Sequence, residues 1–179
     1  MEQLFNQLSE ILFKSLDADE HMKVSIDGEN SQFVRFSQSK VRQAGLVDDA
    51  SLSISLIKDG KTCSGSFTLT GNTKTDEKTA CTELERMREE VVSLPKDPFV
   101  VLPEDTGSSR EDHNGSLLSQ ENAVSALSPA MQGVDLAGIW ASGRIFTGNA
   151  NSAGQKHWFA TDTFSLDYSL ITPDERMVK

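Results

Sequence analysis

Hydrophobic residues recur at helical spacing in two parts of the chain. The first run predicts an amphipathic helix over residues 4–16, and acidic residues typical of a helix N-terminus predict a second helix from about Thr75. Their apolar faces consist of Leu4, Phe5, Leu8, Ile11, Leu12 and Leu16, and of Ala80, Leu84, Met87 and Val91. Pro95 and Pro98 predict the end of the second helix, because the residue before a proline disfavours helical backbone.

Between these helices the pattern changes to the alternation of β-strands. Strands are predicted at residues 24–26, 33–36 and 41–47, with a turn at Asp27–Gly28. The clearest strand alternates apolar residues with serines, and a hairpin turn at Asp59–Gly60 follows it. The alternating apolar residues are Leu52, Ile54 and Leu56 before this turn and Cys63, Gly65, Phe67 and Leu69 after it. The pattern predicts an antiparallel meander with one face on a core and one face rich in hydroxyl groups.

The last third of the chain is rich in β-structure, after a short helix that Ser119 would cap. A strand is predicted at residues 138–146, a turn at residues 148–154 and a further alternating strand at residues 164–170. The predicted fold class is therefore α+β: an antiparallel β meander flanked by helices and followed by a second β-hairpin region.

Three segments are predicted along the chain. Residues 1–102 form an N-terminal α+β domain, and residues 103–118 form a polar exposed loop. Residues 119–179 form a short helix and a β-hairpin that lead toward a C-terminal domain outside this sequence. A hairpin at this position would leave an unpaired strand edge, so we expect that the chain continues or that a partner covers the edge.

The balance of charge narrows the range of partners. The 179 residues carry a formal net charge of −10, which disfavours binding to nucleic-acid phosphates and to anionic membrane surfaces. The two cysteines, Cys63 and Cys81, give no disulfide framework and fit a reducing compartment. The sequence shows neither a secretory signal nor an apolar run long enough to cross a bilayer, so we expect a cytoplasmic location.

No catalytic or metal-binding group of residues can be assigned from the sequence. His21, His113 and His157 are not spaced like zinc ligands, and no serine lies in a G-x-S-x-G context. His157 lies beside Trp158, where a packed or hydrogen-bonded histidine is the favoured interpretation. We therefore predict no catalytic residue and no metal ligand in this chain, so that residues outside it would complete any activity.

A small basic cluster stands out in this acidic chain. Arg35, Lys40 and Arg42, together with Ser37, lie in the segment FVRFSQSKVRQAG. One interpretation is a strand that contacts an acidic or peptide partner, which would make these four residues substrate-binding. The other is a charged edge strand that resists aggregation.

The same segment carries a resemblance to a known family. FVRFSQSKVRQAG, followed by KDGKTCSGSFTLTG, resembles the N-terminal domain of the TldD/PmbA family, once called modulators of DNA gyrase and now regarded as peptidases. GIWASGRIFTGNANSAGQKHWF is similar to the family's glycine-rich strand with an N-S-x-G turn, here residues 151–154. FSLDYSLITPDERMVK is similar to the strand that follows. The motifs occur in the family's order along nearly the whole chain.

The resemblance implies a role in peptide cleavage. Family members are two-domain proteins that dimerise around an enclosed cavity and act on unfolded peptides, including a peptide antibiotic precursor and an antitoxin. The TldD-type subunit binds zinc through an H-E-x-x-x-H helix and a later cysteine, whereas the PmbA-type (TldE) subunit lacks that site. This sequence contains no H-E-x-x-x-H motif, so zinc is implied only for the C-terminal domain of TldD-type members and no catalytic residue is carried over.

Three hypotheses for the function follow. The first is a metallopeptidase component whose N-terminal domain lines the dimer cavity and helps hold an unfolded peptide, as a homodimer or as a heterodimer with a TldD/PmbA-type subunit. The second is a non-catalytic dimerisation or regulatory interaction module. The third, a nuclease or gyrase-binding role, comes only from the old family name, and the acidic charge argues against it.

Overall fold

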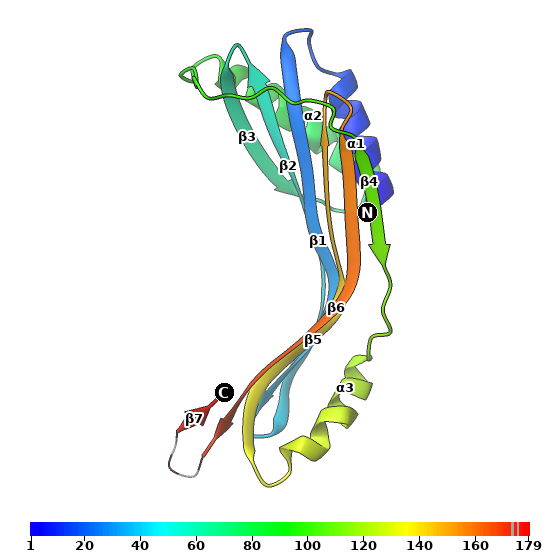
Figure 1. Ribbon diagram of the computed structural model, residues 1–179, viewed down its shortest axis with the longest axis vertical. Coiled ribbons are helices and arrows are strands. Elements are labelled where there is room, and N and C mark those ends of the chain that lie inside the picture. Colours follow the sequence, from blue (N-terminus) through cyan, green and yellow to red (C-terminus); the bar gives the residue numbers. More distant parts are fainter. Residues whose placement is uncertain (173, 175) are drawn as a thin grey trace. The chain divides into compact units, whose positions relative to one another are not determined.

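A computed structural model describes residues 1–172, 174 and 176–179 (Figure 1). Within these residues, seven strands form one antiparallel sheet in the order β3-β2-β1-β5-β6-β4, with β7 paired to β6, so the α+β class predicted from the sequence is confirmed. The strands are β1 (Glu20–Ser37), β2 (Lys40–Lys58), β3 (Lys61–Thr68), β4 (Ser108–His113), β5 (Asp135–Asn151), β6 (Lys156–Ile171) and β7 (Met177–Val178). The helices are α1 (Glu2–Lys14), α2 (Thr73–Val91), α3 (Gln120–Leu127) and the 3-10 helix η1 (Ser128–Met131).

The chain divides into two compact units, and β1, β2, β5 and β6 contribute residues to both. Unit 1 consists of Met1–Gly28, Asp49–Asp112 and Phe146–Phe159. Unit 2 consists of Glu29–Asp48, His113–Ile145 and Ala160–Lys179.

In unit 1, the helices α1 and α2 cover one face of the strands (Figure 1). The core between helices and strands is mainly apolar and includes the buried side chains of Phe5, Leu8, Leu12, Met22, Val24, Ile26, Leu52, Ile54, Leu56, Leu84 and Met87. Trp158 joins this core, where it stacks on Phe146 with ring centroids 5.6 Å apart. Alternate residues of the strands therefore point to the opposite face, which the helices leave uncovered.

In unit 2, the core is smaller. The buried residues Val34, Phe36, Ala123, Met131 and Trp140 pack together, which fastens α3 and η1 onto β1 and β5. Ser119 caps α3 by accepting a hydrogen bond from the Asn122 backbone N–H at 3.3 Å, as its sequence position predicts.

The predicted turn at Asp27–Gly28 is wrong, because β1 passes straight through these residues. A Cβ atom on Gly28 would lie 2.5 Å from the carbonyl oxygen of Asp49 and 2.5 Å from the ring of Phe146. The glycine therefore permits close approach of a neighbouring strand and ring rather than a reversal of the chain. Likewise, the predicted strands at residues 41–47 and 51–56 form the single long strand β2.

The structure also differs from the sequence prediction within residues 103–118, where a polar loop was expected. Residues Ser108–His113 form the strand β4, which pairs with β6 at the edge of the sheet. Its side chains are mostly exposed, so the sequence carries no apolar alternation there. Strand pairing depends on backbone groups, which any sequence provides, and hydrophobic periodicity cannot detect it at an exposed edge. The division into residues 1–102, 103–118 and 119–179 stays a prediction.

A buried carboxylate joins three elements of unit 1. Glu20, at the start of β1, is only 5% exposed and accepts hydrogen bonds from Arg88 of α2 at 2.8 Å and from Lys58 of β2 at 3.2 Å. Arg88 also donates to the backbone oxygen of Ser15, just after α1, at 2.6 Å. Burial by itself raises the pKa of Glu20, but the bonds from Arg88, the Asp17 backbone N–H and Lys58 outweigh it and lower the pKa to about 2.

Replacing Glu20 with glutamine removes this charge and keeps the shape of the side chain. We expect Glu20→Gln to lower the unfolding free energy by about 3 kcal/mol at pH 7, because Arg88 and Lys58 lose their buried counter-charge. Since the folded-state pKa lies below the ordinary value of 4.5, the stabilisation is fully present above that pH and is lost as the pH falls to about 2. Urea unfolding at pH 7 and along an acid series measures both effects.

The matched control is Glu10→Gln. Glu10 pairs with Lys14 on the exposed face of α1, and both side chains are more than half exposed, so this change should leave the urea midpoint nearly unchanged. If Glu20→Gln and Glu10→Gln lowered the unfolding free energy equally, the role given to Glu20 would be contradicted.

Candidate functional site

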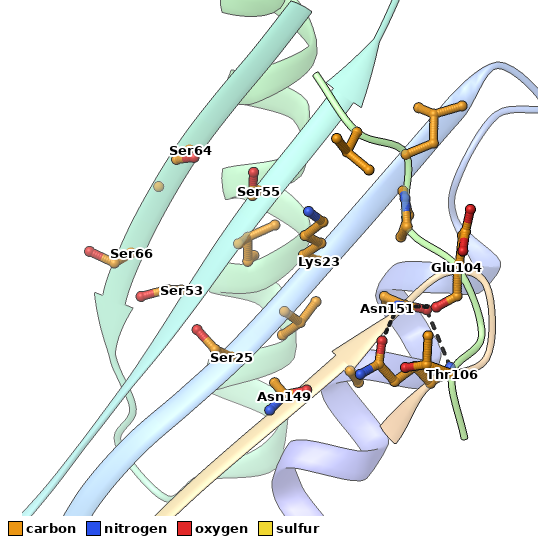
Figure 2. A pocket seen from close by; sticks show the side chains of 18 residues that line it. Lys23, Ser25, Ser53, Ser55, Ser64, Ser66, Glu104, Thr106, Asn149 and Asn151 are labelled. Carbon is orange, nitrogen blue, oxygen red and sulfur yellow. Dashed lines mark hydrogen bonds between the residues drawn. The ribbon is translucent and has the colours of Figure 1, made fainter. Parts of the chain in front are cut away.

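The uncovered face of the unit 1 strands carries a groove of about 820 Å³. Residues 101–106, here called the covering segment, cross this face and form one wall of the groove (Figure 2). The strands β1, β2, β3 and β5 supply the floor through Lys23, Val24, Ser25, Ser53, Ile54, Ser55, Ser64, Gly65, Ser66, Asn149, Ala150 and Asn151. The volume is in the range of ordinary ligand sites.

Serine hydroxyls dominate the floor of this groove. Ser53 lies directly opposite Ser66, and Ser55 directly opposite Ser64, in the antiparallel pairing of β2 with β3. Ser25 of β1 completes the set, and Figure 2 shows these serines on three neighbouring strands. Within the described part of the chain, none of the five hydroxyls hydrogen-bonds to another protein group. They are therefore free to donate to and accept from a bound molecule.

The covering segment is tied to the sheet by Asn151, the last residue of β5. The Asn151 Nδ2 donates to the backbone oxygen of Glu104 at 3.0 Å and to Gln155 Oε1 at 2.9 Å. Its Oδ1 accepts from the backbone N–H groups of Ala153 at 2.9 Å and Gln155 at 3.2 Å. Asn151 is 8% exposed, so all its polar atoms are satisfied inside the protein.

This network fixes the proton position on His157. Because Asn151 donates to Gln155 Oε1, the Gln155 Nε2 amide must donate to His157 Nε2, which lies 2.8 Å away. The neutral ring then carries its proton on Nδ1 and donates to Ser109 Oγ of β4, at 2.8 Å. His157 therefore acts as a donor to Ser109 and is not placed to remove its proton, so the pair is not a nucleophile with its base. The hydrogen-bonded role predicted for His157 is confirmed.

Three solved structures share this fold. TldE from Thermococcus kodakarensis matches with a TM-score of 0.62 and 12% identity, over 100% of this chain and 41% of that protein. A proposed modulator of DNA gyrase from Bacteroides thetaiotaomicron matches with a TM-score of 0.62 and 16% identity, over 98% of this chain and 42% of that protein. Another from Thermotoga maritima matches with a TM-score of 0.58 and 14% identity, over 98% of this chain and 44% of that protein.

The chain has a TldE-type fold. The resemblance to the TldD/PmbA family that the sequence motifs indicate is thus confirmed at the level of the fold. The chain spans about two-fifths of the length of these TldE-type structures. No protein-family model and no curated protein matches the sequence.

The N-S-x-G turn on which the resemblance rests has a structural role in the TldE-type fold. Ser152 pairs with β1, since its backbone N–H donates to Met22 O at 2.9 Å and its Oγ accepts from Met22 N at 3.0 Å. Gly154 has a φ of +116°, which strongly favours glycine. The motif therefore places Asn151 beside the groove and fastens the turn to β1.

The four residues predicted to bind substrate belong to unit 2, and none of them lines the groove of unit 1. Arg35 and Ser37 of β1 line a separate pocket of about 360 Å³ with Tyr168 and Asp167 of β6. Lys40 and Arg42 are exposed at the start of β2, across a turn in which Gln38 and Ser39 both have positive φ. Their substrate-binding role stays a prediction. The groove was missed because its serines were interpreted as a solvated face, although their alternation was visible in the sequence.

The donor groups of the described residues do not fit a zinc ion, which the resemblance implies only for the C-terminal domain of TldD-type members. Among the described residues, no three His, Cys, Asp or Glu side chains come together in a way that could hold a metal ion. We therefore derive no hydrolytic step through zinc in this chain. Burial raises the pKa of the Cys63 and Cys81 thiols, so neither is an activated nucleophile at neutral pH. None of the helices in the described part of the chain is both long and apolar enough to span a membrane.

Substituting Asn151 tests how the covering segment is held. We expect Asn151→Ala to increase proteolytic cleavage and amide hydrogen exchange within residues 101–106, because the segment loses its bond to β5 and three further polar groups lose their partner. The urea midpoint should also fall, by an amount corresponding to about 2 kcal/mol. Hydrogen exchange measured by mass spectrometry distinguishes local opening of residues 101–106 from destabilisation of the whole fold.

Asn149→Ala is the matched control. Asn149 lines the same groove two residues earlier on β5, and within the described residues its side chain makes no hydrogen bond. It should leave exchange of residues 101–106 unchanged. Equal exchange in the two variants would show that Asn151 does not hold the segment.

Proposed function

We propose that this chain is the N-terminal domain of a TldD/PmbA-type metallopeptidase component, and that its groove helps hold an unfolded peptide. The observation that carries the proposal is the set of five unpaired serine hydroxyls on the floor of an 820 Å³ groove, in a fold shared with TldE. The proposal assigns the catalytic zinc site to a separate domain, outside this chain. The chain assembles with a second TldD/PmbA-type subunit, as a homodimer or a heterodimer, around the cavity.

The chemistry of the groove suits a peptide of variable sequence. Hydroxyl and amide groups can donate to and accept from any peptide backbone, because every residue except proline presents one N–H and one C=O. Val101, Leu102 and Pro103 of the covering segment supply an apolar wall for side chains. A ligand held in this way is recognised mainly as extended polypeptide and only weakly by its sequence.

A strand edge lies beside the same groove. β3 stands at the end of the sheet order, so one side of its backbone has no strand partner among the described residues. Ser64 and Ser66 of β3 line the groove, which brings this edge and the hydroxyl groups within reach of one extended chain. Backbone pairing at an edge grips a peptide without requiring a particular sequence.

The alternative is a non-catalytic dimerisation or regulatory module, and one observation in unit 2 favours it. Phe164, Leu166 and Tyr168 of β6 expose 68%, 41% and 46% of their surface. Leu166 and Tyr168 line an apolar pocket of about 290 Å³ together with Leu127 and Met131. Exposed apolar side chains of this kind mark interaction surfaces. A chain that stays monomeric in light scattering and captures no partner would count against this alternative.

Replacing groove serines tests the proposed function directly. We expect the double variant Ser53→Val, Ser55→Val to bind a fluorescein-labelled unfolded peptide about tenfold more weakly, because two hydrogen-bonding groups become methyl groups. Valine keeps the preference for strand structure, so the sheet should be preserved. Fluorescence anisotropy with a casein-derived peptide measures the affinity.

Ser51→Val is the matched control. Ser51 lies on the same strand and the same face, opposite Thr68, but does not line the groove. It should leave peptide affinity unchanged. If unfolded peptides bind equally well to the wild type, to this control and to the double variant, the groove is not the binding site. If the wild type binds no peptide, the proposed function is wrong.

A further inference from the structure

One cation projects into an otherwise nearly neutral groove. Among the described residues that line it, Lys23 is the sole positively charged side chain and Glu104 the sole negatively charged one. Lys23 lies on β1, with the hydroxyls of Ser53 and Ser55 on the adjacent strand β2 (Figure 2). The strand residues that line the groove beside Lys23 are all uncharged.

Lys23 has no side-chain partner among the described residues, unlike three other lysines of unit 1. Lys58 pairs with Glu20, Lys14 pairs with Glu10, and Lys61 donates to the backbone oxygen of Val92 at 2.6 Å. Within the described residues, Lys23 forms neither an ion pair nor a side-chain hydrogen bond. In a chain with a net charge of −10, acidic side chains are plentiful, yet none is placed against this ammonium group.

We infer that Lys23 binds a carboxylate of the peptide held in the groove. This inference rests on the proposed function and adds to it a preference for one class of peptide. An ammonium group offers three donors and a full positive charge, and a carboxylate is the one group of a polypeptide that matches both. The serines that line the groove with Lys23 supply hydrogen bonds but no competing negative charge, so the carboxylate can pair with the ammonium group.

Two sources can supply this carboxylate: the C-terminus of the peptide, or the side chain of an aspartate or glutamate. Three fluorescein-labelled peptides of alanine, serine and leucine separate these sources. One has a free C-terminal carboxylate, one is the same peptide amidated at the C-terminus, and one is amidated and contains a single internal aspartate. Affinities are measured by anisotropy at low salt with the 179-residue chain.

We expect one of the two carboxylate peptides to bind about fivefold more tightly than the uncharged amide, which is the scale of a partly exposed ion pair. Lys23→Met should abolish this difference, whereas Lys23→Arg should retain it. Raising the salt concentration should reduce the difference in the wild type, because salt screens exposed charges. A preference for the free C-terminus or for the aspartate peptide identifies the source.

Lys74→Met is the matched control, since it removes the same charge from the exposed first turn of α2, which does not line the groove. It should leave the preference intact and so exclude a general effect of net charge. Equal affinities for all three peptides, or a preference that survives in Lys23→Met, would overturn the role of Lys23 and leave the proposed function standing. Failure of the wild type to bind any of the peptides would overturn both.

Discussion

The structure of unit 1 depends on one constraint, which is that its two long helices cover only one face of the strands. The side-chain period of a strand is two, so burial of Met22, Val24 and Ile26 in the core forces Lys23 and Ser25 to the other face. The same reasoning applies to Ser53 and Ser55 on β2. The alternation that buries the core residues therefore also places the groove residues on the opposite face. A shift of one residue in strand register would move the apolar side chains into the groove and the polar side chains into the core.

Two buried polar networks complete this arrangement. Around Glu20, opposite charges hold the ends of α1, β1 and α2 together on the helix side. Around Asn151, neutral amides hold the covering segment on the open side. Both networks are almost fully hydrogen-bonded, which makes them rigid, whereas the groove hydroxyls between strands and covering segment remain unpaired.

The fold that carries the groove also occurs as part of longer proteins. TldE and two proposed modulators of DNA gyrase keep this fold at 12–16% identity, and the chain corresponds to about two-fifths of each. Among the described residues, no three His, Cys, Asp or Glu side chains come together to hold a metal ion. In our proposal, this chain holds an extended peptide and, through Lys23, favours a peptide that carries a carboxylate. Hydrolysis is carried out by a domain outside the sequence.

The sequence by itself determined the α+β class, the helices, the hairpin at Asp59–Gly60 and the two faces of β2, because hydrophobic periodicity and turn residues act locally. It also carried the family resemblance. Only the tertiary structure decided that Gly28 allows close packing, that residues Ser108–His113 form a strand, and that the serines of three strands meet under the covering segment. These features arise from contacts between residues far apart in the chain. The local sequence pattern around a residue does not specify which distant strand will pack beside it, so it cannot predict these contacts.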